Sequence, residues 1–212
     1  MGKESTQGDE PPPPLRQSDQ HKLGELFAQH RDRLRRMVRL RMDRRLQGRV
    51  DASDVMQEAY LEASARYADY LREPSMPFYL WLRFITGQKL LVLHRRHLGA
   101  QARDVGREVS LYHGALPEAT SAALAAQLVG RRTSPSQAAV RAEMRIRVQE
   151  AINMMDPIDR EVLALRHFEQ LTNAETAQSL EIEESAASKR YVRALKRLKE
   201  ILTSMPGGMG ET

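Results

Sequence analysis

The chain has 212 residues, of which 41% are hydrophobic, 29% are charged and none is cysteine. The lack of cysteine excludes disulfide bonds and thiolate metal or redox sites. The longest apolar runs, such as residues 90–93, fall far short of the roughly 20 residues that span a bilayer, and no apolar segment resembling a secretory signal follows Met1. We therefore expect a cytoplasmic protein without membrane insertion. The formal net charge of +5 suits a polyanionic partner.

Residues 1–20 are predicted to form a disordered tail. Four consecutive prolines at positions 11–14 cannot continue a helix, and the segment has little apolar surface to offset the entropy of ordering.

Residues 21–98 are predicted to form three helices. Apolar residues recur at spacings of three and four in the first of them: Leu23, Leu26, Phe27, Leu34, Met37, Val38 and Leu40. Gly48 ends this helix, and Asp51 is a candidate N-cap for a second helix with Val55, Ala59, Leu61, Ala63 and Tyr67 on or near one face. Two prolines, Pro74 and Pro77, separate it from a third helix over residues 78–97. Trp81 in that helix is predicted to lie in the core.

Residues 99–134 are rich in glycine, alanine and serine and are predicted to form a flexible linker with one short helical piece near residues 119–129. The helical pattern returns over residues 135–205, and residues 206–212 are predicted to be a disordered tail. No stretch shows the alternation typical of a strand. The expected fold class is therefore all-α, with two small helical domains joined by a flexible linker.

Basic residues concentrate in two separate segments. The segment 31–49 contains nine arginines and only two acidic residues, Asp32 and Asp43. The segment 189–199 contains six basic residues and no acidic residue. Two separated basic helices suit a long polyanion such as DNA. The alternative is that both are solvated helix faces.

The C-terminal segment has the signature of a helix-turn-helix. Pro157 after Asp156 marks a helix start, and Thr172 with Glu175 predicts a capping box that opens a short helix. Its inner face would carry Ala174, Ala177 and Leu180. Residues 181–183 form the turn, where Glu181 stands in place of the usual glycine.

A longer helix follows over residues 184–202, with a single apolar stripe made of Ala187, Tyr191, Ala194, Leu195, Leu198, Ile201 and Leu202. This layout places the second helix in a major groove. Ser185, Ser188 and Lys189 lie near its start, where base edges are read. The basic residues further along suit phosphates: Arg190, Arg193, Lys196 and Arg197. An amphipathic hairpin with a solvated basic face is the alternative.

Taken together, three motifs resemble bacterial sigma factors of the extracytoplasmic-function (ECF) group, which keep only the second and fourth sigma regions. They are DASDVMQEAYLEA at residues 51–63, FYLWLRFITGQKLLVLHRR at residues 78–96, and the helix-turn-helix segment at residues 157–202. The resemblance places the second region at residues 21–98 and the fourth at residues 135–205.

The resemblance implies three binding sites. The core-polymerase site would comprise Asp51, Asp54, Val55, Gln57 and Glu58. The site for the −10 promoter element would comprise Arg83, Gln88, Lys89, Arg95 and Arg96, with Gln88 and Lys89 on bases and the arginines on phosphates. The site for the −35 element would comprise Ser185, Ser188, Lys189, Arg190, Arg193 and Arg197. Gln88 and Val92 replace the family's common Asn and Asp, which leaves the base that is read at −10 open.

The resulting prediction is a sigma factor that binds core RNA polymerase and directs promoter-specific initiation. A stand-alone helix-turn-helix regulator and a helical adaptor that binds another protein are the alternatives. The resemblance adds an anti-sigma factor or a regulatory kinase as a further partner, and Thr172, Ser185 and Ser188 are phosphorylation candidates by residue type. No catalytic residues, cofactor or metal site are expected, since His94 and His97 have no acidic ligand beside them.

Overall fold

The computed structural model describes residues 16–46, 48–98, 119–129 and 138–205. Within these ranges all regular secondary structure is helical and no strand occurs, so the predicted all-α class is confirmed. The predicted C-terminal tail, and most of the predicted linker and N-terminal tail, lie outside the described residues.

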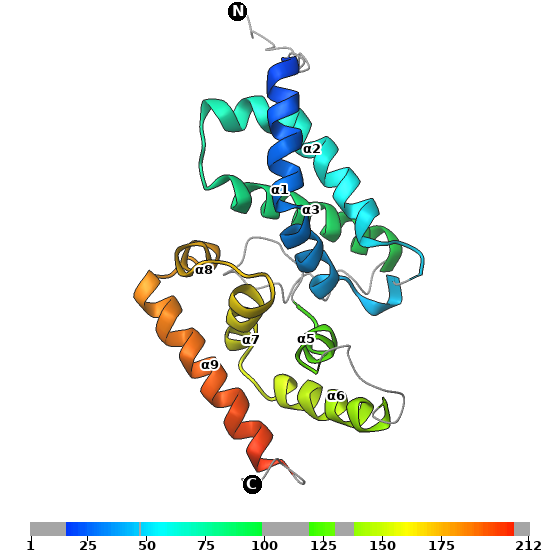
Figure 1. Cartoon of the computed structure of the whole chain (residues 1–212), viewed down its shortest axis with the longest axis vertical. Coiled ribbons are helices and arrows are strands. Elements are labelled where there is room, and N and C mark those ends of the chain that lie inside the picture. Colours follow the sequence, from blue (N-terminus) through cyan, green and yellow to red (C-terminus); the bar gives the residue numbers. More distant parts are fainter. Residues whose placement is uncertain (1–15, 47, 99–118, 130–137, 206–212) are drawn as a thin grey trace, which may run out of the picture.

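Three helices form the N-terminal half, residues 16–98 (Figure 1). They are α1 (Gln17–Arg41), α2 (Ala52–Arg72) and α3 (Phe78–Leu98), with a short 3-10 turn, η1 (Arg44–Leu46), between the first two. Helix α1 begins four residues before the predicted start. The Asp51 cap is confirmed: its carboxylate accepts from the backbone N–H of Asp54, whose own carboxylate accepts from the N–H of Asp51 at 2.8 Å.

The core of this half is aromatic at one end. Trp81 is only 8% exposed, and its ring stacks on that of Tyr70 with centroids 4.6 Å apart, so the predicted core role of Trp81 is confirmed. Stacked aromatic pairs add to the stabilisation that comes from area burial alone. The prediction for Leu61 is wrong: it is 62% exposed, because it lies off the stripe formed by Val55, Ala59 and Ala63.

The C-terminal half, residues 119–205, contains five α-helices and one π-helical turn in its described part. They are α5 (Ser121–Leu128), α6 (Ala138–Asn153), α7 (Pro157–Leu163), the π-helical η3 (Ala164–Phe168), α8 (Asn173–Leu180) and α9 (Glu184–Ser204). Helix α5 confirms the short helical piece predicted inside the linker. Asp156 caps α7 with Pro157 in the first turn, and the capping box of Thr172 and Glu175 opens α8, both as predicted.

Two positions of the predicted apolar faces are wrong. Ala174 is exposed, and the buried face of α8 is formed by Thr176, Ala177 and Leu180. The buried hydroxyl of Thr176 donates to the backbone carbonyl of Thr172 at 2.8 Å, so its polar atom is satisfied. Leu195 on α9 is 41% exposed, because it lies beside the stripe that Ala187, Ala194 and Leu198 bury.

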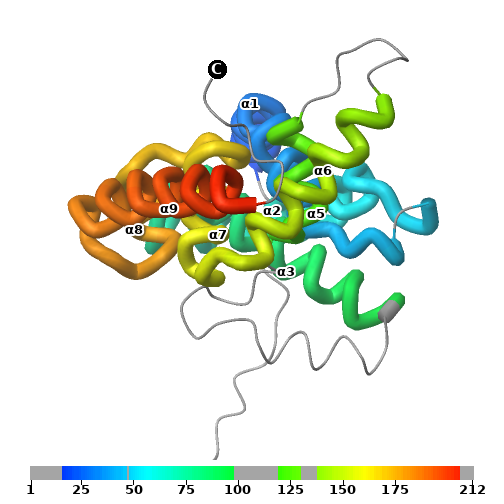
Figure 2. The backbone as a smooth tube through the Cα atoms, turned by 90° about the horizontal axis from the view of Figure 1, so that it is seen from below, coloured from blue at the N-terminus to red at the C-terminus, as the bar shows by residue number. Residues whose placement is uncertain are grey.

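The two halves share their cores. Apolar residues of the C-terminal half join the core of α1–α3, among them Val162, Leu165 and Leu180. Conversely Leu40 of α1 packs in the second core, with α5, α6, α7 and α9. Figures 1 and 2 show α7 and α8 beside the first and third helices. The division into two domains with a flexible linker stays a prediction; in this structure the halves are packed together.

Candidate functional site

The helix-turn-helix is built by local backbone chemistry. Glu181 ends α8 with φ of 53°, in the left-handed region, as its place in the predicted turn requires. The N–H of Ile182 then donates to the carbonyl of Ala177 at 3.0 Å, which satisfies a free C-terminal carbonyl of α8. The side-chain amide of Asn173 donates to the carbonyl of Glu184 at 2.8 Å. This bond joins the first turns of α8 and α9.

The outer face of α9 is basic and exposed. Among the candidate −35 residues, Ser185, Ser188, Lys189, Arg193 and Arg197 are exposed and lie along this one helix.

Two of the basic candidates on α9 have acidic neighbours. Half-buried Arg190 lies 3.7 Å from a carboxylate oxygen of Asp159 on α7, and Arg197 lies 3.7 Å from Glu200. Within the described residues, neither Lys189 nor Arg193 has an ion pair, so their charges face solvent. This arrangement fits phosphate and base contacts at the start and middle of the helix.

The candidate −10 residues divide into an exposed and a paired group. Arg95 and Arg96 are exposed in the last turn of α3, and Arg96 lies 3.9 Å from Glu58 of α2. Lys89 is half-buried and its ammonium lies 2.6 Å from a carboxylate oxygen of Glu62. Half-buried Gln88 precedes it. The structure therefore brings Gln88, Lys89, Arg95 and Arg96 onto one helix.

The fifth −10 candidate, Arg83, is only 5% exposed and points away from this group. Its Nε donates to Glu169 of the C-terminal half at 2.7 Å. In this arrangement the Arg83 guanidinium has no access to a DNA phosphate.

The candidate polymerase-binding residues lie at the N-terminal end of α2. Asp51 and Asp54 form its capping box and are exposed, Gln57 is exposed, and Glu58 is half-buried. The backbone N–H groups of Ser53 and Asp54 lower the pKa of Asp51, so this carboxylate is ionised. Val55 is completely buried, so it supports the helix from within and offers no side chain to a partner.

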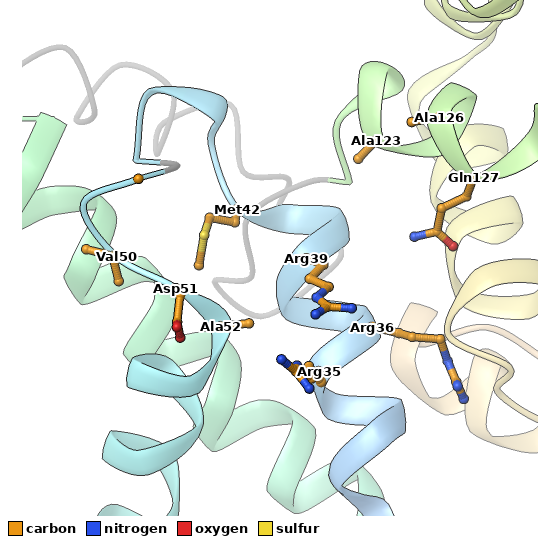
Figure 3. A pocket seen from close by; sticks show the side chains of 11 residues that line it. Arg35, Arg36, Arg39, Met42, Val50, Asp51, Ala52, Ala123, Ala126 and Gln127 are labelled. Atoms are coloured by element: carbon orange, nitrogen blue, oxygen red, sulfur yellow. The ribbon is translucent and has the colours of Figure 1, made fainter. Parts of the chain in front are cut away.

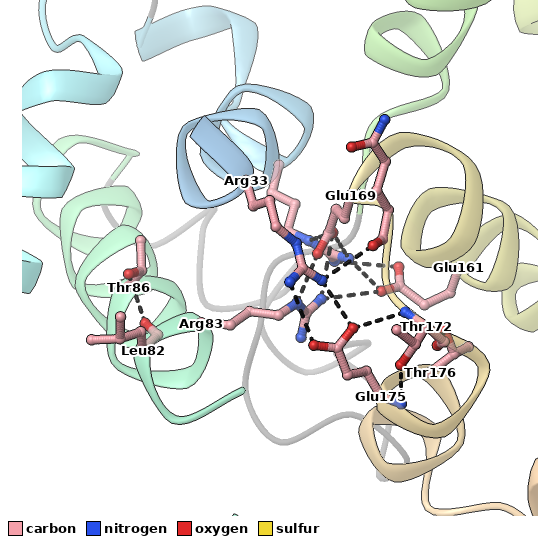
Figure 4. A network of polar contacts seen from close by, with 11 residues as sticks. Arg33, Leu82, Arg83, Thr86, Glu161, Glu169, Thr172, Glu175 and Thr176 are labelled. Carbon is pink, nitrogen blue, oxygen red and sulfur yellow. Dashed lines mark hydrogen bonds and ion pairs between the residues drawn. The ribbon is translucent and has the colours of Figure 1, made fainter. Parts of the chain in front are cut away.

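A buried group of four charged residues joins the two halves and was not predicted from the sequence (Figure 4). We call Arg41, Arg83, Glu161 and Glu169 the arginine–glutamate clasp. The Arg41 guanidinium donates to Glu161 at 2.5 Å and to Glu169 at 2.6 Å. Glu169 also accepts from Arg83, so one carboxylate pairs with an arginine from α1 and an arginine from α3. The side chain of Glu169 is 0% exposed.

Charges decide the ionisation of the clasp. Burial alone would raise the pKa of Glu169, but the charges and hydrogen bonds of Arg41 and Arg83 outweigh it and hold that pKa below its ordinary value. Burial likewise disfavours the charged form of Arg41, while Glu161 and Glu169 raise its pKa above the ordinary value. Glu169 and Arg41 are therefore both ionised at neutral pH.

A ring of partly exposed contacts surrounds the clasp. Arg33 of α1 donates to Glu175 at 2.9 Å and to the backbone carbonyl of Gln170 at 3.1 Å, and its guanidinium lies 3.6 Å from the ring centroid of Tyr79. Arg36, one turn on, donates to the side chain of Gln170 at 2.9 Å. Burial raises the pKa of Tyr79 to about 12, so its hydroxyl stays neutral.

The lowered pKa values make stability depend on pH. Burial alone would raise the pKa of Glu175, but the hydrogen bond from Arg33 and the backbone N–H of Thr172 hold it below the ordinary value of 4.5, and Glu169 is lowered too. A lowered folded-state pKa stabilises the fold above the ordinary pKa, and this contribution is lost as pH falls through the lowered value. We therefore expect the urea midpoint to fall as the pH is lowered from about 5 to about 3. The variant Glu169→Gln should show a smaller fall, and an equal fall would contradict the assignment.

Beside the clasp, the arginines of α1 also line a pocket of about 810 Å³ (Figure 3). Arg35, Arg36 and Arg39 form one wall, Asp51 lies at the start of α2, and the uncharged helix α5 supplies Gln127. The Nε of Arg35 is buried without a hydrogen-bond partner. The pocket is thus a cationic surface next to the candidate polymerase-binding residues.

The described residues show neither a metal-binding group nor a membrane-spanning helix. They contain no group of three or more His, Cys, Asp and Glu side chains arranged for a metal ion. His94 is half-buried and its Nε2 accepts from the N–H of Asp43 at 3.3 Å, and burial lowers its pKa. It is therefore a neutral acceptor inside the N-terminal half. No described helix has the length and apolar character needed to cross a membrane.

Comparison with known proteins agrees with this geometry. Residues 145–198, which contain α7, α8 and most of α9, match the family described as Sigma-70, region 4. The chain is 28% identical to the ECF RNA polymerase sigma factor SigD of Mycobacterium tuberculosis and of Mycobacterium bovis over 182 residues, which cover 86% of this chain and 77% of the relative. The resemblance to ECF sigma factors is confirmed.

Two solved structures are also similar to this chain. CnrH, solved in complex with the cytosolic domain of CnrY, is 22% identical with a TM-score of 0.49, and the match covers 88% of this chain and 91% of CnrH. The sigma factor RpoE from Bartonella quintana, solved with the anti-sigma factor NepR, is 18% identical with a TM-score of 0.48, over 88% of this chain and 99% of RpoE.

Proposed function

We propose that this chain is a sigma factor that binds core RNA polymerase and directs promoter-specific initiation through the −10 and −35 elements. One observation carries the proposal: the segment that matches sigma region 4 is the segment that folds as a helix-turn-helix with a basic, exposed second helix. Sigma factors are not known as enzymes, and we propose no enzymatic activity for this one. Its place would be the cytoplasm, where its partners are.

The three exposed surfaces take separate roles in this proposal. The start of α2, around Gln57, would contact core polymerase. The C-terminal turns of α3, with Arg95 and Arg96, would contact the −10 element, where cations hold the backbone of the separated strand. Helix α9 would enter the major groove at −35, with Lys189 near the bases. An anti-sigma factor or a kinase would be the regulator.

Reconstituted transcription tests the proposal against its alternative. The full chain is mixed with core polymerase and with templates selected by genomic binding, and promoter-specific transcripts are measured. A stand-alone regulator would bind duplex DNA tightly without polymerase and start no transcript. No initiation on any selected template would therefore reject the sigma-factor role.

Removing the exposed α2 side chains should weaken polymerase binding. We expect the double variant Gln57→Ala, Glu58→Ala to bind core polymerase about tenfold or more weakly, because interface positions that matter each contribute about 1 kcal/mol or more. Neither residue takes part in the capping box of Asp51 and Asp54, so the helix should stay intact. The Kd for core polymerase is measured by fluorescence titration.

The matched control for this pair is Arg72→Ala at the other end of α2. The Arg72 side chain is 77% exposed and, among the residues that the structure describes, pairs only with Asp69 of the same helix, and such surface pairs contribute little to stability. Its Kd should stay within about twofold of the original. Equal binding by the double variant and the original chain would remove α2 from the polymerase interface.

A further inference from the structure

The cationic pocket lined by α1, the start of α2 and α5 takes no part in the promoter contacts proposed above (Figure 3). We infer that it binds a small molecule that carries two or more phosphate groups and a flat ring, the chemistry of a nucleoside di- or triphosphate. No described residue of α3 or α9 lines this pocket, so the site is separate from both candidate DNA-binding helices. Its occupancy does not depend on the sigma-factor role.

Two of the pocket arginines lack the acidic partners that other arginines of α1 have. Arg33 lies 2.9 Å from Glu175, and Arg41 belongs to the clasp. Within the described residues, neither Arg35 nor Arg39 takes part in an ion pair. These two lie one turn apart on α1, where like charges destabilise a helix. An anion bound between them would remove this repulsion, so the pair is suited to hold one.

The charge of the pocket lining stays positive. Arg36 is the third arginine, and its guanidinium donates to the uncharged side chain of Gln170 at 2.9 Å. Among the described lining residues Asp51 is the one acid, and its carboxylate already accepts from two backbone N–H groups in the first turn of α2. The Nε atoms of Arg35 and Arg36 are buried and, within the described residues, have no hydrogen-bond partner. Guanidinium groups bind phosphate oxygens through charge-assisted hydrogen bonds, so three arginines suit a ligand with two or more phosphates.

The rest of the lining is uncharged and mostly apolar. Helix α1 lies between the start of α2 and α5 (Figure 3), and the backbone N–H of Thr120 donates to the carbonyl of Leu40 at 3.0 Å, which holds α5 beside α1. The apolar lining residues are Met42, Val50, Ala52, Ala123 and Ala126. Side chains of this kind leave room for a flat ring, and the amide of Gln127 can donate to and accept from the ring's edge.

Size and lining favour a small molecule over a nucleic-acid strand. The pocket has a volume of about 810 Å³, within the roughly 300–1,000 Å³ of most small-molecule sites. A single strand is usually bound along a cationic groove with aromatic side chains on which its bases stack, and no aromatic residue is found among the described lining residues. Contacts to a backbone phosphate need cations alone, whereas this pocket pairs its cations with an apolar wall. A nucleotide has a part for each.

Calorimetric titration of the full chain with ATP and with GTP tests the site. At least one of them should bind about tenfold or more tightly than inorganic triphosphate, which lacks the ring, and adenosine, which lacks the phosphates, should not bind measurably. Arg35→Gln with Arg39→Gln should weaken nucleotide binding about tenfold or more, because hydrogen bonds to charged groups contribute about 1.5–3 kcal/mol each. The matched control, Lys22→Gln with Arg31→Gln, removes the same charge from exposed positions of α1 outside the lining and should stay within about twofold.

A carboxylate placed in the pocket tests the site from its other wall. Ala126 on α5 is exposed and lines the pocket, so Ala126→Glu should occupy the space of the ligand and repel its phosphates. We expect nucleotide binding to fall about tenfold or more. Leu128→Glu adds the same charge to the same helix at a 40% exposed position outside the lining and should stay within about twofold. Circular dichroism checks that both variants keep their helix content.

Three results would overturn the nucleotide site, and none of them involves transcription. The first is that neither ATP nor GTP binds the original chain. The second is that Lys189→Ala with Arg193→Ala abolishes nucleotide binding while the pocket variants bind normally, since the phosphates would then lie on the DNA-binding face of α9. The third is that a single-stranded oligonucleotide depends on Arg35 and Arg39 more strongly than the nucleotides do, since the occupant would then be a strand.

Discussion

Replacing Glu169 by alanine is expected to lower the free energy of unfolding by about 3–5 kcal/mol, the usual effect of removing one partner from a buried ion pair. The loss is large because Glu169 is the shared acceptor of the clasp. Without it Arg83 loses its closest acidic partner among the described residues, and Arg41 loses one of its buried acidic partners. Urea denaturation of the full chain, followed by circular dichroism, measures the change.

A glutamate that is not buried provides the comparison. Glu200 on α9 pairs with Lys196 and Arg197, but its side chain is 51% exposed, and exposed ion pairs contribute less than about 1 kcal/mol. Glu200→Ala should therefore change the free energy of unfolding by less than about a third of the Glu169→Ala effect. If both variants lose the same amount, the clasp is not what joins the halves, and the shared apolar residues Val162 and Leu165 would have to suffice.

Local chemistry made much of the fold predictable from sequence. The caps by Asp51, Asp156 and Thr172 and the left-handed turn residue Glu181 each depend on a few adjacent residues, and all are found where expected. Most apolar stripes were predicted for the same reason. The error at Leu195 concerns a position beside a stripe, where the helical period alone does not separate a buried edge from an exposed one. Leu61 lies two residues from both Ala59 and Ala63, and so on the opposite side of its helix, which the helical period does distinguish.

The clasp was missed because its partners are far apart in sequence. Charged residues on a helix are usually solvated, and nothing near Arg41 reveals a partner about 120 residues away. One local signal existed: Leu34, Met37, Val38 and Arg41 follow the spacing of a single apolar face. An arginine that continues such a face must find a buried acceptor. The π-helical turn that supplies Glu169 has no comparable sequence signal.

The second large effect concerns promoter binding by α9. We expect Lys189→Ala with Arg193→Ala to reduce promoter-specific initiation by about 30-fold or more, because each base or charged contact to DNA contributes about 1–3 kcal/mol. Both side chains are exposed and, within the described residues, make no ion pair. Their loss should therefore affect DNA binding and leave the free energy of unfolding nearly unchanged. Initiation is measured in the reconstituted assay over a range of salt concentrations.

Salt dependence separates a DNA contact from a general effect of charge. Each lost phosphate contact reduces the slope of log affinity against log salt by about 0.9, so the double variant should show a shallower slope as well as weaker initiation. The charge-matched control is Arg16→Ala with Lys22→Ala, two exposed residues at the N-terminal end of the described chain. It removes the same charge far from α9 and should keep both the activity and the slope. If this control loses as much activity as the α9 variant, net charge rather than a helix in the major groove attracts the DNA, and the assignment of α9 to the −35 element fails.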